Sequence, residues 1–185
     1  MRLFVAVNPP RQLCRELDTR LDDLRAQVPV AWTTAENWHL TLMFLADWPV
    51  ARLPELVEAL RHAAARHAPF TVRPGQVGGF PDLQRPRVLF LQMDGGDPLR
   101  LLARDIRAAV DSIWPDGPQD HKPMLPHLTL ARIKRPLAAQ ELTRLRRFEP
   151  RAGEPFTVTE ALLVSSELQP QGPRHRREAA LPLSG

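Results

Sequence analysis

Cysteine is almost absent from this chain, and lysine is scarce. Cys14 is the single cysteine among 185 residues, so the chain can form no internal disulfide and no zinc site built from paired cysteines. This scarcity favours a reducing compartment, and we expect a cytoplasmic protein. Only Lys122 and Lys134 among the 25 basic residues are lysines, and the formal charge is +4. The charge favours an RNA or nucleotide partner, although such an arginine bias can equally reflect the base composition of a genome.

Long apolar runs and phosphate-cradling glycine motifs are also missing. The apolar segment MRLFVAV meets Asn8-Pro9-Pro10 after seven residues, so we expect a buried strand and neither a signal segment nor a membrane span. The glycines of VGGFP match neither phosphate-binding template, and we expect a turn there. No linker or low-complexity segment divides the chain, which predicts a single domain over residues 1–185.

Hydrophobic periodicity predicts an α+β fold. Apolar residues recur at three- and four-residue spacing in four predicted helices, 11–28, 53–65, 98–114 and 138–148. Two-residue alternation or short apolar runs predict strands at 3–7, 39–45, 70–72, 88–93, 127–132, 156–164 and 179–183. We expect loops at 77–87 and at the GPRHRRE segment, 172–178. The order of strands and helices suggests two copies of one pattern, that is, two lobes related by an internal pseudo-duplication.

The tetrapeptide HLTL occurs twice, as HLTLMF from His39 and as HLTLAR from His127. The offset, 127 − 39 = 88 residues, is close to half the chain. A chance repeat of this kind is expected on the order of once in a hundred chains. The repeat therefore indicates two related strands.

Each HLTL strand carries a histidine and a threonine on one face. Because side chains alternate along a strand, His39 and Thr41 point to one side, and His127 and Thr129 do the same in the second copy. Two imidazoles can serve as general base and general acid at a phosphodiester, while hydroxyls bind its non-bridging oxygens. The alternative is that both are ordinary amphipathic strands whose polar face meets solvent.

The residues after the two tetrapeptides differ. Strict alternation places Phe44 in the core, whereas a twist or bulge would let it stack on a nucleobase. Arg132 is either a solvated surface charge or a phosphate ligand. We expect no metal site, because His62 and His67 are five residues apart on a predicted helix and project from different faces.

At this point the chain resembles the 2H phosphoesterases, and within them the bacterial RNA 2′,3′-cyclic phosphodiesterases that are also called 2′-5′ RNA ligases. The similar segments, in the family's order, are MRLFVAV, WTTAENWHLTLMFL, PFTVRPGQVGGFP, PRVLFL, PHLTLAR and LLVSSELQPQGP. The resemblance implies a bilobal fold of two pseudo-twofold-related antiparallel sheets, with outer helices around a central cleft. It also implies hydrolysis of a 2′,3′-cyclic phosphate to a 2′-phosphomonoester without metal or cofactor, and possible 2′-5′ ligation in reverse.

The resemblance further implies that His39 donates a proton, that His127 accepts one, and that Thr41 and Thr129 bind phosphate. The near symmetry of the motifs leaves the direction of proton transfer open. We expect a monomer that acts on RNA ends or cyclic nucleotides and not at a membrane. Two alternatives remain, a noncatalytic RNA-binding protein and a phosphodiesterase for another cyclic phosphate such as ADP-ribose 1″,2″-cyclic phosphate. His175 stands where the family usually has tyrosine, and could help to bind RNA or lie in a solvated loop.

Overall fold

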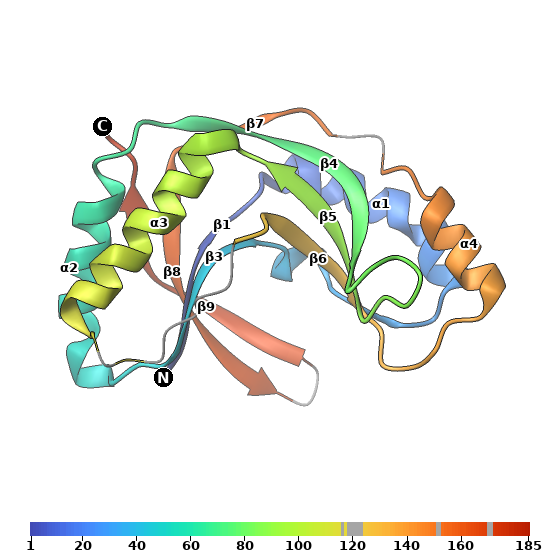
Figure 1. Cartoon of the computed structure of the whole chain (residues 1–185), viewed down its shortest axis with the longest axis horizontal. Helices are drawn as coiled ribbons and strands as arrows, with labels where there is room; N and C mark the ends of the chain where they lie inside the picture. Colours follow the sequence, from blue (N-terminus) through green and yellow to red (C-terminus); the bar gives the residue numbers. More distant parts are fainter. Residues whose placement is uncertain (116, 118–123, 151–152, 170–171) are drawn as a thin grey trace.

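The structure, a computed structural model of the chain, describes residues 1–115, 117, 124–150, 153–169 and 172–185. These residues form the α+β fold that the sequence predicts, with the helices outside a curled antiparallel sheet (Figure 1). The helices are α1 Arg11–Gln27, α2 Leu53–Ala64, α3 Gly96–Ile113 and α4 Ala139–Arg147, with short 3-10 helices η1 Ala35–Asn37 and η2 Val50–Arg52. The strands are β1 Arg2–Val7, β2 Ala31–Trp32, β3 Leu40–Asp47, β4 Phe70–Phe80, β5 Val88–Asp94, β6 His127–Arg132, β7 Phe156–Val158, β8 Glu160–Gln169 and β9 Gly172–Pro182.

The strands follow one path through the described residues, β7-β4-β5-β6-β3-β1-β8-β9, and β2 pairs with β6. The two HLTL strands, β3 and β6, meet in the middle of this path at the antiparallel pair Leu40–Leu128. On one side of that pair the order is β6-β5-β4, and on the other it is β3-β1-β8. The two sheets expected from the sequence are therefore the two halves of one curled sheet.

The helices cover the two ends of this sheet. Helix α1 packs with α4 at one end, and α2 packs with α3 at the other (Figure 1). Helix α1 buries Leu13, Leu17, Leu21 and Leu24, the leucines whose spacing predicts it. Full burial of one leucine side chain contributes about 1.5–3 kcal/mol, so this row is sufficient to fix the helix on the sheet.

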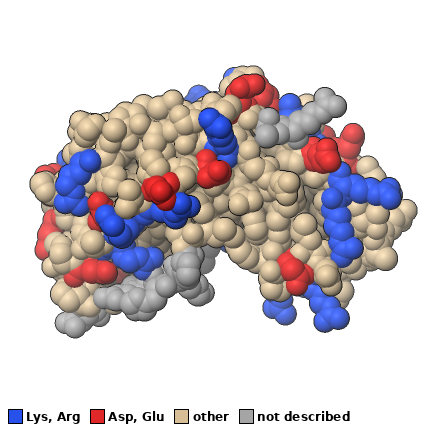
Figure 2. Space-filling model, turned by 45° about the horizontal axis from the view of Figure 1, so that its top comes forward, with Lys and Arg blue, Asp and Glu red and all other residues tan. Residues whose placement is uncertain are grey.

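Strand β1 is apolar on both faces. Leu3, Val5 and Val7 belong to the main core under the helices, whereas Phe4 and Ala6 belong to a smaller buried cluster on the opposite face. We call this opposite side of the sheet the cleft face. Figure 2 shows that the molecule is hollowed between its two helical ends.

The loop predicted at 77–87 starts too early. Strand β4 continues to Phe80, and Gly78 and Gly79 pair with Phe90 and Leu89 of β5. A Cβ at Gly78 would lie 2.4 Å from the ring of Phe90, so glycine is needed there because an aromatic ring crosses the strand. The turn is confined to residues 81–87.

The expected solvated loop at GPRHRRE is also wrong, because this segment is the first part of strand β9. Strand β8 pairs with it along its length, including Ser166 with His175. Arg176 pairs with Glu178 at 2.9 Å, and Arg177 with Glu160 at 3.5 Å. Two of the three arginines around His175 are thereby tied to acids.

Among the residues that the structure describes, no helix is long and apolar enough to cross a membrane. Lys122, one of the two lysines noted in the sequence, lies outside the described residues.

Candidate active site

The two HLTL segments lie next to each other in opposite directions. Leu40 and Leu128 face each other and are fully buried. One position to either side of this pair, the antiparallel register brings His39 towards Thr129 and Thr41 towards His127, on the cleft face. Each histidine therefore lies nearest to the threonine of the other copy, as a twofold axis between the strands requires.

Both histidines are anchored through the same ring nitrogen. His39 Nδ1 lies 2.7 Å from the carbonyl oxygen of Asn37, and His127 Nδ1 lies 2.6 Å from that of Leu125. A carbonyl oxygen only accepts, so Nδ1 carries the hydrogen in each ring and donates it. The free ring nitrogen is therefore Nε2, which makes no hydrogen bond within the described residues in either histidine.

A bulge follows the threonine in both strands. In β3, Thr41 pairs with Ala6 and Met43 with Val5, so Leu42 is the extra residue. In β6, Thr129 pairs with Phe90 and Ala131 with Leu89, and Leu130 is the extra residue at the same place in the motif. The extra residue reverses the alternation that the sequence predicts for the rest of each strand.

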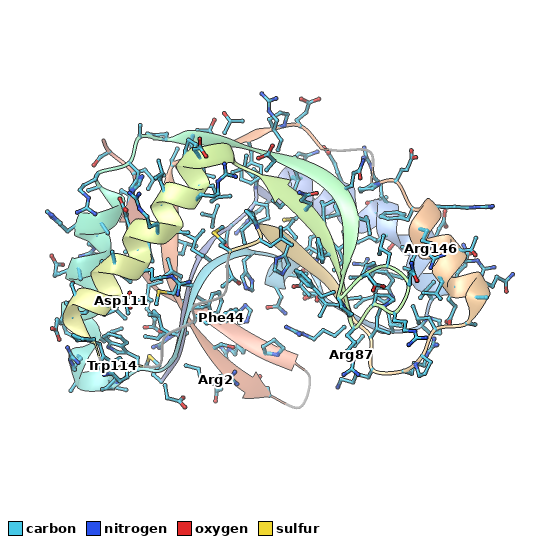
Figure 3. The ribbon with its side chains drawn as sticks, viewed as in Figure 1. Arg2, Phe44, Arg87, Asp111, Trp114 and Arg146 are labelled. Atoms are coloured by element: carbon cyan, nitrogen blue, oxygen red, sulfur yellow. The ribbon has the colours of Figure 1, made fainter. Side chains whose placement is uncertain are left out.

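The reversal changes the position of the sixth residue in each motif. Phe44 is 56% exposed and pairs with Phe4, whose ring is 6.1 Å from its own on the cleft face. The placement of Phe44 in the core is therefore wrong, and the alternative that allowed a bulge is correct about its exposure. Figure 3 shows Phe44 near the middle of the molecule, between its two helical ends.

Arg132 is the counterpart of Phe44 in the second motif. It is exposed and lies opposite Val88, which in turn lies opposite Phe80, so all three share the cleft face. Arg132 forms no ion pair with another described residue. Its guanidinium is free to meet an anion.

His39 is the more enclosed of the two histidines. The ring of Phe4 stacks on it with centroids 4.6 Å apart, and the ring of His175 meets it edge-on at 5.2 Å. Burial lowers the pKa of His39 to about 4, the hydrogen bond to Asn37 opposes this shift, and positive charge on His175 and His127 adds to it. The imidazole is therefore neutral at neutral pH. Burial also lowers the pKa of His175.

His127 has aromatic neighbours of another kind. Phe80 and Phe90 lie 5.3 and 5.2 Å from its ring, and both are strongly tilted to it, at 79° and 58°. They pack on each other at 4.5 Å. The sequence predicts neither ring, nor Phe4, as part of the site. No local sequence pattern identifies these three rings, because the register of their strands with the HLTL strands cannot be predicted from local periodicity.

The threonine hydroxyls complete the group. Neither Thr41 nor Thr129 uses its hydroxyl in a hydrogen bond within the described chain, and both side chains are partly accessible. Hydroxyls in this position can donate to an anionic oxygen. The site thus presents two imidazole Nε2 atoms, two hydroxyls and one free guanidinium on a single face.

The other histidines of α2 and its C-terminal turn do not contribute to this site. His67 lies 3.1 Å from Asp105 on α3, in an ion pair on the other side of the molecule. No group of three or more His, Cys, Asp or Glu residues able to hold a metal ion occurs in the part of the chain that the structure describes. The groups described above at this site are ring nitrogens, hydroxyls and a guanidinium.

A family model described as the 2′-5′ RNA ligase superfamily matches residues 9–170. The chain belongs to this superfamily. It is 37% identical over 181 residues to the RNA 2′,3′-cyclic phosphodiesterase of Thermus thermophilus, covering 94% of this chain and 85% of that protein. The RNA 2′,3′-cyclic phosphodiesterase of Geobacillus stearothermophilus is 30% identical over 183 residues, 98% of this chain, but the chain spans only 57% of its length.

Solved structures of the superfamily have the same fold. The crystal structure of TT0787 of Thermus thermophilus superposes with a TM-score of 0.82 at 32% identity, covering 100% of this chain and 99% of that one. The structure of LigT of E. coli complexed with 3′-AMP superposes with a TM-score of 0.74 at 26% identity, covering 100% and 98%. Phe4 and His175 lie outside residues 9–170, the part of the chain that the family model matches. Both rings that enclose His39 therefore come from the flanking strands β1 and β9.

Proposed function

We propose that this superfamily member hydrolyses the 2′,3′-cyclic phosphate of RNA ends or nucleosides to a 2′-phosphomonoester, without a metal ion. One observation carries the proposal: His39 and His127 are both anchored through Nδ1 and expose Nε2 on one face. The names of the relatives from Thermus and Geobacillus support this substrate class, and the 3′-AMP complex of LigT supports a nucleotide ligand.

The reaction needs two proton transfers on opposite sides of the phosphorus. His127 Nε2 accepts a proton from water as the water oxygen bonds to phosphorus. The bond between phosphorus and O3′ breaks, and His39 Nε2 donates its proton to O3′. The two imidazoles supply both transfers, so no step requires a metal-bound water.

The low pKa of His39 is compatible with its role as the acid. Its imidazole is neutral at neutral pH when no anion is bound beside it, since burial lowers the pKa to about 4. A cyclic phosphate carries one negative charge. A negative charge beside the ring favours the protonated, positively charged form of the imidazole. The substrate therefore brings the charge that allows His39 to be protonated. An imidazolium held in a site that disfavours its charge is a strong donor to the departing oxygen.

The remaining groups bind the phosphate and the nucleoside. Thr41 and Thr129 donate to the two non-bridging oxygens from opposite sides, and the Arg132 guanidinium attracts the anion. Phe44, exposed beside Phe4, offers a flat apolar surface on which a nucleobase can stack.

The same site run in reverse joins a cyclic phosphate to a 5′-hydroxyl, which forms a 2′-5′ bond. We further propose that residues 1–185 act as one duplicated domain, as a monomer and in the cytoplasm. The mirrored strand order about the Leu40–Leu128 pair supports the duplication.

Turnover of a 2′,3′-cyclic nucleoside monophosphate in the presence of EDTA tests the proposal. The wild type should form only the 2′-phosphate, and His39→Ala and His127→Ala should each lose about 10²–10⁴-fold in rate. A wild type that fails to turn over any nucleoside cyclic phosphate would favour the noncatalytic RNA-binding alternative or another cyclic phosphate. Turnover that neither substitution reduces would rule out the two histidines.

A further inference from the structure

A groove of about 800 Å³ lies beyond the far end of β6 from His127. One wall is the turn between β4 and β5, and the other is the segment between β6 and α4. Four cations line it, Arg85 and Arg87 from the first wall and Lys134 and Arg135 from the second. Neither a carboxylate nor an aromatic ring is among its lining residues. None of the site residues described above lines it either.

The charge of this groove is largely unneutralised. Arg135 is engaged by Glu141 at 2.6 Å, and it also donates to two backbone carbonyls. Arg85, Arg87 and Lys134 are exposed and form no ion pair with any residue that the structure describes. The nearby Asp82 carboxylate accepts from the backbone N–H groups of Gln84 and Arg85, and the positive charge of Arg85 also acts on it. Arg87 and Lys134, one from each wall, are the cations of the groove without such an acidic neighbour among the described residues, and they attract a polyanion.

The groove is joined to the active site by backbone hydrogen bonds. The N–H of Arg87 donates to the carbonyl of Phe80, whose ring contacts His127, and the N–H of Ile133 donates to the carbonyl of Arg87. Arg132, on the cleft face, directly precedes the second wall. From the Cα of His127 to that of Arg132 the strand runs roughly 17 Å, so the groove begins about one strand length from the histidines.

Figure 2 shows that Lys and Arg side chains lie among Asp and Glu side chains at both ends of the molecule, so the overall surface charge does not by itself mark the groove. Figure 3 places Arg87 beside the turn between β4 and β5, on the α4 side of the cleft and away from Asp111 and Trp114.

We propose that this basic groove binds backbone phosphates of an RNA strand whose 2′,3′-cyclic end occupies the active site; this inference rests on the proposed function. Guanidinium and ammonium groups bind phosphate oxygens, and no aromatic ring on which bases could stack is among the lining residues, so the groove favours the backbone phosphates. The groove therefore extends the substrate from a cyclic nucleotide to an oligonucleotide, with little dependence on its sequence.

The test compares a cyclic mononucleotide with an oligonucleotide that ends in a 2′,3′-cyclic phosphate. The double variant Arg87→Gln/Lys134→Gln removes one free cation from each wall. It should hydrolyse the mononucleotide like the wild type and lose on the order of tenfold in kcat/KM for the oligonucleotide at low salt. The matched control, Arg100→Gln/Arg104→Gln on α3, removes the same charge at the other end and should affect neither substrate.

Salt dependence gives a second measure. Loss of two phosphate contacts to a single strand lowers the salt slope by about 1.4, so from about 50 to 200 mM salt the wild type should lose about sevenfold more affinity than the variant. Equal losses for both substrates, or an oligonucleotide loss no larger than in the control, would overturn the inference. If the wild type hydrolyses neither substrate, the proposed function fails instead. In that case, the anisotropy of a labelled oligonucleotide measures its binding to the groove. A salt slope that is the same in the groove variant as in the wild type overturns the inference.

Discussion

His39 and His127 are held by the same backbone device in different surroundings. Each donates Nδ1–H to a carbonyl two residues earlier, each precedes a threonine and then a bulge, and each strand buries its leucines. Yet His39 lies flat against one ring and edge-on to a second imidazole, whereas His127 meets two phenylalanine rings that are strongly tilted to its own. A duplicated motif can therefore supply two chemically distinct groups.

The difference arises in the flanking strands. On β1, Phe4 lies opposite Phe44, the sixth residue of the first motif. On β5, Phe90 lies opposite Thr129, the third residue of the second motif. The motif fixes the direction of each imidazole. The residues that surround each imidazole determine how far it is exposed to water.

Removal of either threonine hydroxyl should have the largest effect. Thr41→Val and Thr129→Val keep the shape of the side chain and should each lower kcat/KM for a cyclic nucleotide by about 10²-fold, because a donor to the phosphate is lost. Thr→Ser at either position should retain most of the activity, and Thr143→Val on α4 is a control. Losses that differ by more than tenfold between the two sites would show that the threonines are not equivalent.

Acid should destabilise the protein through His39. Its pKa is about 4 in the folded chain and about 6.5 when unfolded, so between these values the unfolded chain binds more protons. This contribution to stability is complete above pH 6.5 and is lost as the pH falls towards 4, by about 2–3 kcal/mol. Denaturant unfolding at several pH values should show a shallower loss in His39→Gln than in the wild type. Parallel curves would contradict the buried environment of this ring.

Gly78→Ala should disturb the surroundings of His127 and leave those of His39 unchanged. The added Cβ would lie 2.4 Å from the Phe90 ring, so we expect a loss of about 1–3 kcal/mol and displacement of that ring from His127. Gly75→Ala in the same strand places its Cβ 3.4 Å from Gln92 and is the matched control. Denaturant unfolding and the NMR titration of both histidines measure the outcome. An unchanged His127 signal would show that Phe90 does not shape its environment.

The smallest effect concerns His175. His175→Phe keeps a ring beside His39 but removes a charge that lowers the pKa of His39, so this pKa should rise from its value of about 4. The limb of the kcat/KM profile against pH that reports His39 should move to higher pH with it. His62→Phe, on α2, is the control. A limb that stays in place would show that enclosure by Phe4 alone sets the titration of His39.

The sequence predicts the helices, most strands and the site histidines because these depend on local period and on a repeated motif. Strict alternation places Phe44 in the core because it counts residues, whereas the alternative of a bulge is realised at Leu42, which adds one residue to the count. The sequence predicts a loop at residues 77–80 because glycine usually marks turns, whereas here Gly78 makes room for a ring. The contact of His175 with His39 depends on the pairing of β9 with β8 and of β8 with β1, which no local pattern records.

The division of roles between the two histidines is tested most directly by a substrate with sulfur in place of the bridging 3′ oxygen. A thiolate leaves without protonation far more readily than an alkoxide, because the pKa of a thiol is several units lower than that of an alcohol. If His39 is the acid, His39→Ala should recover most of its lost rate on this substrate while His127→Ala stays impaired. Rescue of His127→Ala in place of His39→Ala would reverse the assignment, and rescue of neither would contradict a dedicated proton donor in this site.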